Sequence, residues 1–159
     1  KTLGLTGEVR IRHSNAMAIF ATEEFEICTR LVQGEYYKYQ NMFKELPLHT
    51  VISRKELLDA MVRAKMCTAE KCPVKFEIAG SQLGLSIKDQ TTDYHETVDL
   101  QENISEELTI GFEARLVIEA LKAFDCDNVG ISLQSPKMPM IIEAEDSDFK
   151  TIVLPVAIK

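Results

Sequence analysis

A strand-like segment that runs directly into an amphipathic helix occurs twice in this sequence, and the repeat limits the possible folds more than any other feature. In residues 108–124 (LTIGFEARLVIEALKAF), apolar residues first alternate and then recur at helical spacing after Glu113. Residues 49–65 (HTVISRKELLDAMVRAK) show the same two patterns in the same order. Ser53 is a candidate N-cap for this helix, and Glu56 completes a capping box. The residues after each helix distinguish a true repeat from two unrelated amphipathic helices.

Each of the two helices is followed by three strand-like runs. These runs are 74–79, 83–88 and 92–100 after the first helix, and 128–134, 138–144 and 150–156 after the second. Gly80 and Gly84 favour a hairpin between the first two runs. Earlier in the chain, short connections that imply antiparallel hairpins separate three further runs, at 8–13, 16–22 and 25–32. The sequence therefore predicts two copies of a β-α-β-β-β unit, preceded by the last three strands of another copy.

This order of elements predicts an α+β fold with both helices on one side and antiparallel sheets on the other. Pseudo-twofold symmetry would place the helices side by side, so that their outward faces pool positive charge. The pooled cations are Arg54, Lys55, Arg63, Lys65, Arg115 and Lys122. Acidic residues concentrate instead in strands and turns, for example at Asp93, Glu96, Glu143, Glu145, Asp146 and Asp148.

The composition is that of an ordinary folded protein, with 159 residues, 45% hydrophobic and 27% charged. No apolar run is long enough to span a bilayer, and no basic-then-apolar leader opens the chain, so we expect a cytoplasmic protein with no membrane partner. The four cysteines form no CxxC pair and predict free thiols without a metal. A net charge of −7 argues against nucleic-acid binding unless positive charge is confined to one face.

Candidate catalytic residues lack the partners that chemistry would need. The carboxylates at 143–148 lack the spacing of a calcium loop and predict a solvated turn. His95 has Asp93 and Glu96 nearby but no nucleophile motif, which favours an exposed strand histidine. Cys126 lies between two aspartates without any protease motif. We therefore expect no catalytic site, no metal and no cofactor.

The C-terminal segment is more suggestive, because residues 152–158 are apolar and include Pro155. Alternate residues of this segment are expected in the core. The others, together with Tyr37, Tyr39 and Met42, could border a groove that accepts a partner peptide.

Four stretches of the chain resemble the C-terminal part of a bacterial DNA polymerase III beta subunit, the replicative sliding clamp. They are TRLVQGEYYKY with the apolar Met42 after it, TIGFEARLVIEAL, DNVGISL and the terminal TIVLPV. In that family, three domains of two βαβββ units make one subunit, and two subunits close into a ring around duplex DNA. The resemblance implies that residues 1–40 are the truncated end of the middle domain and that residues 41–159 are the complete third domain.

The resemblance also implies roles for particular residues. The six cations of the helices would face DNA, and the protein would be a non-catalytic processivity factor that forms a homodimer when full length. Short hydrophobic peptides of the polymerase III alpha subunit, the clamp loader and repair proteins would bind a pocket made by Tyr37, Tyr39, Met42, Met138, Pro139, Ile152, Leu154, Pro155 and Val156. The ring interface would use Met66, Cys67, Asp93, Tyr94, His95 and Glu96.

Two positions depart from the family pattern, and other functions stay open. The family often has proline where Tyr37 stands and arginine where Ala157 stands, which alters the pocket and its rim. One alternative is a stand-alone peptide-binding module that does not encircle DNA. Another is a small hydrolase that uses His95 and Glu96.

Overall fold

The computed structural model describes residues 7–67, 72–88 and 92–158, in which the chain divides into two compact units, Lys1–Asn41 and Met42–Lys159. The first unit is an antiparallel meander of three strands, β1 (Arg10–His13), β2 (Met17–Ala21) and β3 (Glu26–Arg30). A 3₁₀ turn, η1 (Tyr39–Met42), lies at the division between the units. The prediction of three short antiparallel strands before the first repeat is confirmed.

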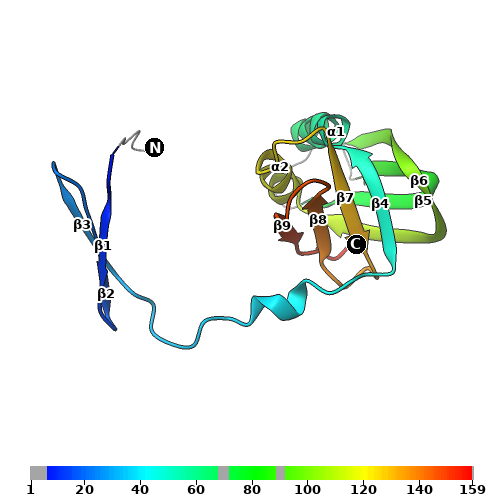
Figure 1. Ribbon diagram of the computed structural model, residues 1–159. Helices are drawn as coiled ribbons and strands as arrows, with labels where there is room; N and C mark the ends of the chain where they lie inside the picture. The colour runs from blue at the N-terminus through cyan, green and yellow to red at the C-terminus, as the bar shows by residue number, and fades with distance from the viewer. Residues whose placement is uncertain (1–6, 68–71, 89–91, 159) are drawn as a thin grey trace. The chain divides into compact units, whose positions relative to one another are not determined.

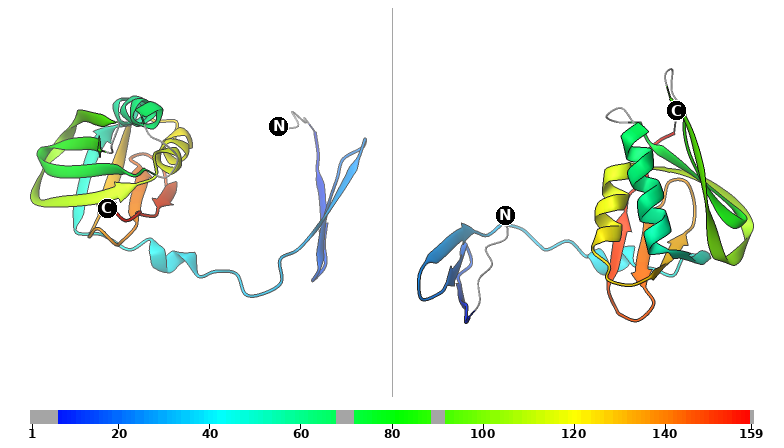
Figure 2. Two further views of the ribbon diagram at one scale, coloured as in Figure 1. Left: turned by 180° about the vertical axis from the view of Figure 1, so that it is seen from behind. Right: turned by 90° about the horizontal axis from the view of Figure 1, so that it is seen from above.

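The second unit is a six-stranded sheet with two helices (Figure 1). The strand order is β5-β6-β4-β7-β8-β9, and all paired neighbours are antiparallel. The strands are β4 (Leu48–Ser53), β5 (Val74–Lys88), β6 (Asp93–Phe112), β7 (Asn128–Leu133), β8 (Met140–Ala144) and β9 (Lys150–Val153). The helices, α1 (Arg54–Cys67) and α2 (Ala114–Lys122), run side by side on one side of the strands (Figure 2). This confirms the predicted α+β architecture.

Both helices follow their strands directly, as the sequence pattern predicted. At the start of α1, the backbone N–H of Glu56 donates to Ser53 Oγ at 3.3 Å, which confirms Ser53 as the N-cap. The backbone N–H of Arg54 donates to the carbonyl oxygen of Asp127 at 2.9 Å, so this helix end is also tied to the segment between α2 and β7. No helix in the described ranges has the length and apolar character needed to cross a membrane.

The hairpin predicted between Gly80 and Gly84 is wrong. One continuous strand, β5, covers both glycines, and β6 likewise joins the two runs that the sequence suggested on either side of residues 101–107. Pairing between β5 and β6 shifts register between Ile78 and Gln82, and Gly80 has φ +57° at that point. A β-bulge bends the ribbon where a turn was expected, and glycine accommodates the positive φ that it requires.

The C-terminal strand is shorter than predicted. It ends at Val153, and Val156 instead forms an isolated antiparallel bridge with Gly111 of β6. Strand β8 begins at Met140, so Met138 and Pro139 lie in the connection that precedes it.

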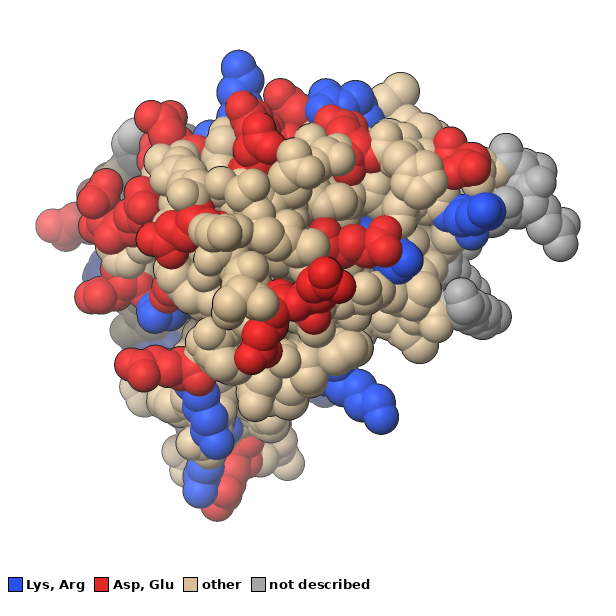
Figure 3. Space-filling model, turned by 90° about the vertical axis from the view of Figure 1, so that its right-hand side faces the viewer, with Lys and Arg blue, Asp and Glu red and all other residues tan. Residues whose placement is uncertain are grey.

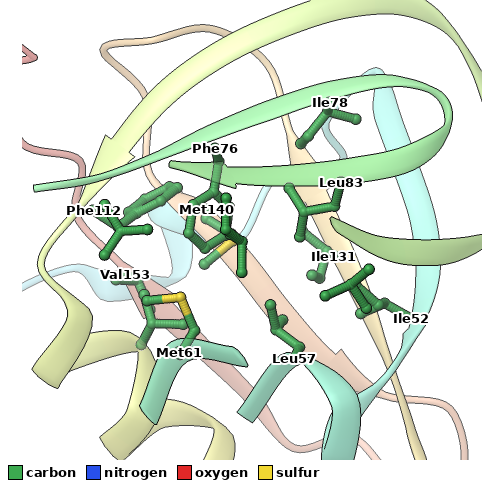
Figure 4. Close-up of a cluster of buried hydrophobic side chains, with 14 of the residues drawn as sticks. Ile52, Leu57, Met61, Phe76, Ile78, Leu83, Phe112, Ile131, Met140 and Val153 are labelled. Carbon is green, nitrogen blue, oxygen red and sulfur yellow. The ribbon is translucent and has the colours of Figure 1, made fainter. Parts of the chain in front are cut away.

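The core lies between the two helices and the strands (Figure 4). Leu57 and Met61 of α1 are fully buried, and they point toward side chains from both halves of the sheet. Phe76 of β5 and Phe112 of β6 pack edge to face, with ring centroids 5.0 Å apart. Burial of these apolar side chains is the main source of folding free energy. The same burial determines which face of each helix stays exposed to solvent.

Adjacent positions of α1 provide a matched test of this packing. Met61 is fully buried, whereas Val62 is 39% exposed. We expect Met61→Ala to lower the free energy of unfolding by about 2–5 kcal/mol, because it removes apolar contacts and leaves a cavity. Val62→Ala should change it by less than about 0.5 kcal/mol. Urea denaturation followed by circular dichroism measures both, and equal losses would contradict the assigned helix face.

Candidate functional site

All six predicted cations lie on α1 or α2, but the fold already uses some of them. Arg54 is half-buried, and its Nε donates to the carbonyl oxygen of Cys126 at 2.5 Å. This bond holds the first turn of α1 against the segment after α2. The guanidinium group of Arg54 therefore has a structural role in the fold.

Arg63 is paired with the carboxylate of Glu96 on β6. Its Nε donates to Glu96 Oε2 at 3.0 Å, and its Nη2 contacts Oε1. This hydrogen bond raises the pKa of Arg63 and is the main reason that the pKa of Glu96 lies below its usual range. The Tyr94 hydroxyl lies within hydrogen-bonding distance of the same carboxylate and 3.1 Å from the carbonyl oxygen of Ala60. Burial, followed by the neighbouring Glu96, raises the pKa of Tyr94. The network joins α1 to β6 and neutralises a predicted DNA-facing charge.

Arg115 is also balanced by neighbouring acids. Its Nε lies 3.1 Å from Glu113 Oε1, and its Nη1 lies 3.3 Å from Glu119 Oε1, one helical turn away. The hydrogen bond that Arg115 Nε donates to Glu113 raises the pKa of Arg115. Lys55 and Lys122 are exposed, and neither forms an ion pair within the described ranges. The helix face therefore offers fewer free cations than the sequence suggests.

Negative charge gathers on the strands, as predicted. Figure 3 shows acidic side chains spread over the face that lies on the β5–β6 side of the second unit. Exposed acids of β6 are Asp93, Asp99, Glu102, Glu106 and Glu107. The negative net charge is thus carried largely away from the helices. Three exposed acids on the helices, Glu56, Asp59 and Glu119, nevertheless reduce the net positive charge of the helix face.

A groove of about 390 Å³ separates α2 from β9. One wall consists of Leu116, Glu119, Ala120 and Ala123, and the other is the strand end at 151–154. Leu154 is 57% exposed at this edge, whereas Val153 turns into the core. Small alanines on the helix leave room between the two walls. The groove offers an apolar surface with a single acidic side chain, Glu119, on its helix side.

Two of the residues predicted for a peptide pocket, Ile152 and Leu154, line this groove. Pro155 and Val156 follow in the chain, but Val156 is bound to Gly111, and Met138 and Pro139 lie outside the groove lining. Tyr37 and Tyr39 belong to the first unit, where Tyr36 and Tyr39 pack edge to face with centroids 5.9 Å apart. Met42 is the first residue of the second unit.

Sequence reasoning missed the helical wall of the groove. Leu116 and Ala120 are among the apolar residues at helical spacing in this segment, and both pack against the core, but they are only partly buried and also line the groove. Ala120 and Ala123 are three residues apart and therefore share a face. That spacing of small residues was the available signal.

A second depression, of about 280 Å³, lies between residues 43–46 and the outer face of the sheet. Here His49 Nδ1 lies 3.1 Å from Ser132 Oγ and 3.7 Å from Glu143 Oε1, and Lys150 Nζ pairs with Glu143 Oε2 at 2.5 Å. In a catalytic triad the hydroxyl and the carboxylate use opposite ring nitrogens. Because both lie on the same nitrogen of His49, the arrangement is not a triad. Glu143, predicted to lie in a solvated turn, is in β8 and is paired.

The other chemical candidates have structural surroundings. His95 Nε2 lies 2.9 Å from Asp93 Oδ1, and both side chains are more than 60% exposed. Cys126 Sγ donates to the carbonyl oxygen of Asn128 at 3.0 Å, and burial raises its pKa. All four cysteines are free, and the described ranges hold no cluster of three or more His, Cys, Asp or Glu that suits a metal ion.

The proposed ring edge combines the end of α1 with the first half of β6. Met66 is 82% exposed, and Cys67 is also exposed. Strand β6 pairs with β5 along its first half, but its pairing with β4 is a single residue pair, Leu100 with Ile52. Within the described ranges, the stretch of β6 before Leu100 has no strand paired with it on its β4 side. Such an edge can pair with another strand.

The Arg63–Glu96 contact predicts a specific pH dependence of stability. Because the folded-state pKa of Glu96 is depressed, its contribution is present above the usual carboxyl value of 4.5 and is lost as the pH falls through the folded-state pKa. Glu96→Gln should therefore be less stable than the native protein at pH 7, and the difference should shrink progressively below pH 4.5. Urea denaturation at several pH values measures this, with Glu106→Gln at an exposed position of β6 as control. A difference that does not vary with pH would contradict the assignment.

Comparison with known proteins assigns the family. The family model described as DNA polymerase III beta subunit, C-terminal domain, matches residues 44–157. The beta sliding clamp of Streptococcus pneumoniae is 27% identical over 155 residues, covering 93% of this chain and 41% of that protein. The clamp of Vibrio cholerae is 26% identical, with the same coverage of each chain.

Solved structures agree with this assignment. A putative DNA polymerase III beta subunit from Eubacterium rectale is 28% identical with a TM-score of 0.84, covering 94% of this chain and 41% of that one. The sliding clamp of Pseudomonas aeruginosa, 21% identical, shares the fold with a TM-score of 0.87 over 98% of this chain and 43% of its own. The chain thus spans about two fifths of the length of these relatives. The chain belongs to the DNA polymerase III beta subunit family, with residues 44–157 matching its C-terminal domain.

Proposed function

We propose that this chain is the C-terminal part of a bacterial sliding clamp, a non-catalytic processivity factor that tethers the replicative polymerase to DNA. In this proposal, residues 1–40 are the last strands of the middle domain, and residues 41–159 are the third domain. The observation that supports it is the pair of adjacent helices on one side of the strands (Figure 2). A largely apolar groove between α2 and β9 also supports it. The relatives named sliding clamps support the same function.

The proposed DNA-facing surface consists of the six cations of α1 and α2. With Arg63 and Arg115 already paired to carboxylates, Lys55 and Lys122 would carry much of the attraction to phosphates. Contacts of this kind are independent of base sequence and are strongly screened by salt. A ring needs only such loose contacts, because it is retained on duplex DNA by topology and must slide.

The proposed partner site is the groove between α2 and β9. An extended hydrophobic peptide could place apolar side chains between Leu116 and Leu154, with the alanines of α2 beneath them. The partners would be the polymerase III alpha subunit, the clamp loader and other proteins with a short clamp-binding motif. Within the second unit, Met42, Met138, Pro139, Pro155 and Val156 are proposed to lie around this site. The expected contribution of Tyr37 and Tyr39, which belong to the first unit, stays a prediction.

The full-length protein is proposed to form a homodimeric ring. The open half of β6 and the exposed Met66 would pair with another subunit. Asp93, Tyr94, His95, Glu96 and Cys67 complete this proposed interface.

A stand-alone peptide-binding module is the alternative. It is favoured by the groove, which lies entirely within the second unit, and by the internal pairing of two of the six helix cations with carboxylates. Retention of the full-length protein on circular DNA separates the two proposals, because a ring is released when the circle is linearised and a peptide-binding module is not retained at all.

Peptide binding tests the groove. The chain should bind a fluorescent peptide containing two leucines and a phenylalanine in the order QLxLF. Leu154→Asp and Ala120→Asp should each weaken binding by about tenfold or more, because both place a charge in the apolar groove. Val62→Asp, an exposed apolar position of α1, is the matched control. Equal effects of Val62→Asp and Leu154→Asp on fluorescence anisotropy would count against the groove.

DNA binding tests the helix face. We expect the chain to bind duplex DNA weakly, with a dissociation constant above about 1 μM at physiological salt. The double variant Lys55→Gln, Lys122→Gln should reduce low-salt binding more than Arg63→Gln, Arg115→Gln, which removes the same number of charges from groups already paired. Electrophoretic mobility or anisotropy titrations measure this. Submicromolar affinity, or the reverse order of the two variants, would refute this account.

A further inference from the structure

We propose that Gly111 is a positioning residue for the peptide groove, because it fixes the course of the C-terminal segment 154–158. This inference rests on the proposed docking function. Gly111 does not line the groove; it lies in β6, where its backbone contacts the segment that follows β9. Its effect on a partner would therefore be exerted through the segment it holds.

The contact leaves no room for a side chain at position 111. The N–H of Val156 donates to the carbonyl oxygen of Gly111 at 2.8 Å. A Cβ added to Gly111 would lie 2.7 Å from Ile158 Cγ1 and 2.8 Å from the carbonyl oxygen of Val156. Carbon and oxygen atoms in ordinary van der Waals contact are farther apart than this. The second contact is with backbone, so rotation of a side chain cannot relieve it.

The bridge holds the groove edge from one end. Val153 pairs with Met140 in the sheet, and Val156 is held by Gly111 three residues later. Leu154 lies between these two fixed points, which restrict where its 57% exposed side chain can stand. Without the bridge, the exposed segment after the last strand of the sheet would be free to move.

The same bridge reaches the other wall of the groove. Gly111 is followed by Phe112, which is buried in the core, and then by α2, whose Leu116 lines the groove. The strand that carries Gly111 therefore runs directly into the helical wall. By joining this strand to the segment after β9, the bridge sets the two walls relative to each other.

Gly130 provides a matched control in the same sheet. A Cβ at Gly130 would lie 3.0 Å from His49 Cε1 and 3.1 Å from Glu143 Cγ, both of which belong to side chains. These side chains can shift by a few tenths of an ångström. Gly130→Ala therefore reduces the conformational entropy of the unfolded chain as Gly111→Ala does, but it displaces no backbone near the groove.

The test compares Gly111→Ala and Gly130→Ala in the 159-residue chain. Hydrogen exchange followed by NMR should show about tenfold or greater acceleration at the Val156 amide in Gly111→Ala, with core amides of β7 unchanged. Affinity for the QLxLF-type peptide should fall about tenfold or more in Gly111→Ala and little in Gly130→Ala. Adding Ile158→Gly to Gly111→Ala removes one of the two close contacts and should restore part of the affinity, which a general loss of folding would not allow.

The outcomes are distinguishable. If the exchange rate of the Val156 amide is unchanged in Gly111→Ala, the inference is overturned. It is also overturned if that exchange rate rises while the affinity for the peptide is unchanged. If the native chain binds no peptide, the docking proposal fails while the exchange data still decide whether Gly111 holds the segment. If Gly111→Ala does not fold, Val156→Pro replaces it, because proline removes the N–H donor and adds no atom at Gly111. Retained affinity in a folded Val156→Pro protein would overturn the inference.

Discussion

The shared core of the two helices and the six-stranded sheet is the constraint on which the rest of the structure depends. Side chains from both helices and from the sheet are fully or almost fully buried in this core. They are Leu57 and Met61 of α1, Val117 and Leu121 of α2, and Phe76 and Phe112 of the sheet. Each helix therefore has one orientation about its axis that buries its apolar stripe. Because both stripes face the same strands, the polar faces of both helices must point away from them and lie next to each other. The proposed DNA-facing surface is a geometric consequence of this packing and needs no separate device to assemble it.

The charges on that surface show how an acidic protein can present a weakly positive face. Glu113 and Glu119 are close enough to Arg115 to compensate it, and Glu96 reaches Arg63 from β6. Exposed pairs of this kind contribute little to stability, but they lower the local positive potential. Under the proposed function, a surface that attracts DNA mainly through Lys55 and Lys122 would hold it loosely. For a protein retained by encirclement, weak attraction permits movement along the duplex, whereas a dense array of free arginines would oppose it.

The sequence was most informative where local pattern and core packing act together. The strand-to-helix transitions and the N-cap at Ser53 follow from spacing and from local hydrogen bonding, and the structure confirms both. The β5–β6 ribbon could not be predicted, because glycine signals a turn and a bulge equally well, and only pairing across the sheet decides between them. The groove depends on how far Ala120 stands from Leu154, residues that are distant in the sequence. The polar cluster of His49, Ser132 and Glu143 likewise arises from the register of three strands, which no local pattern encodes.

The Arg63–Glu96–Tyr94 network means that the helix face and the open strand edge are not independent surfaces. Arg63 belongs to the proposed DNA-facing set, and Glu96 belongs to the proposed ring edge, yet the two side chains bind each other. Any partner group that draws Glu96 away from Arg63 increases the positive charge available on α1. Thermodynamic linkage then requires the converse, so that an anion bound at Arg63 releases Glu96 toward the edge. The coupling is confined to a single exposed ion pair, which limits its strength. It nevertheless places a contact between the two proposed surfaces at one carboxylate, Glu96, which also lies within hydrogen-bonding distance of the Tyr94 hydroxyl. The same hydroxyl lies 3.1 Å from the backbone carbonyl oxygen of Ala60 in α1.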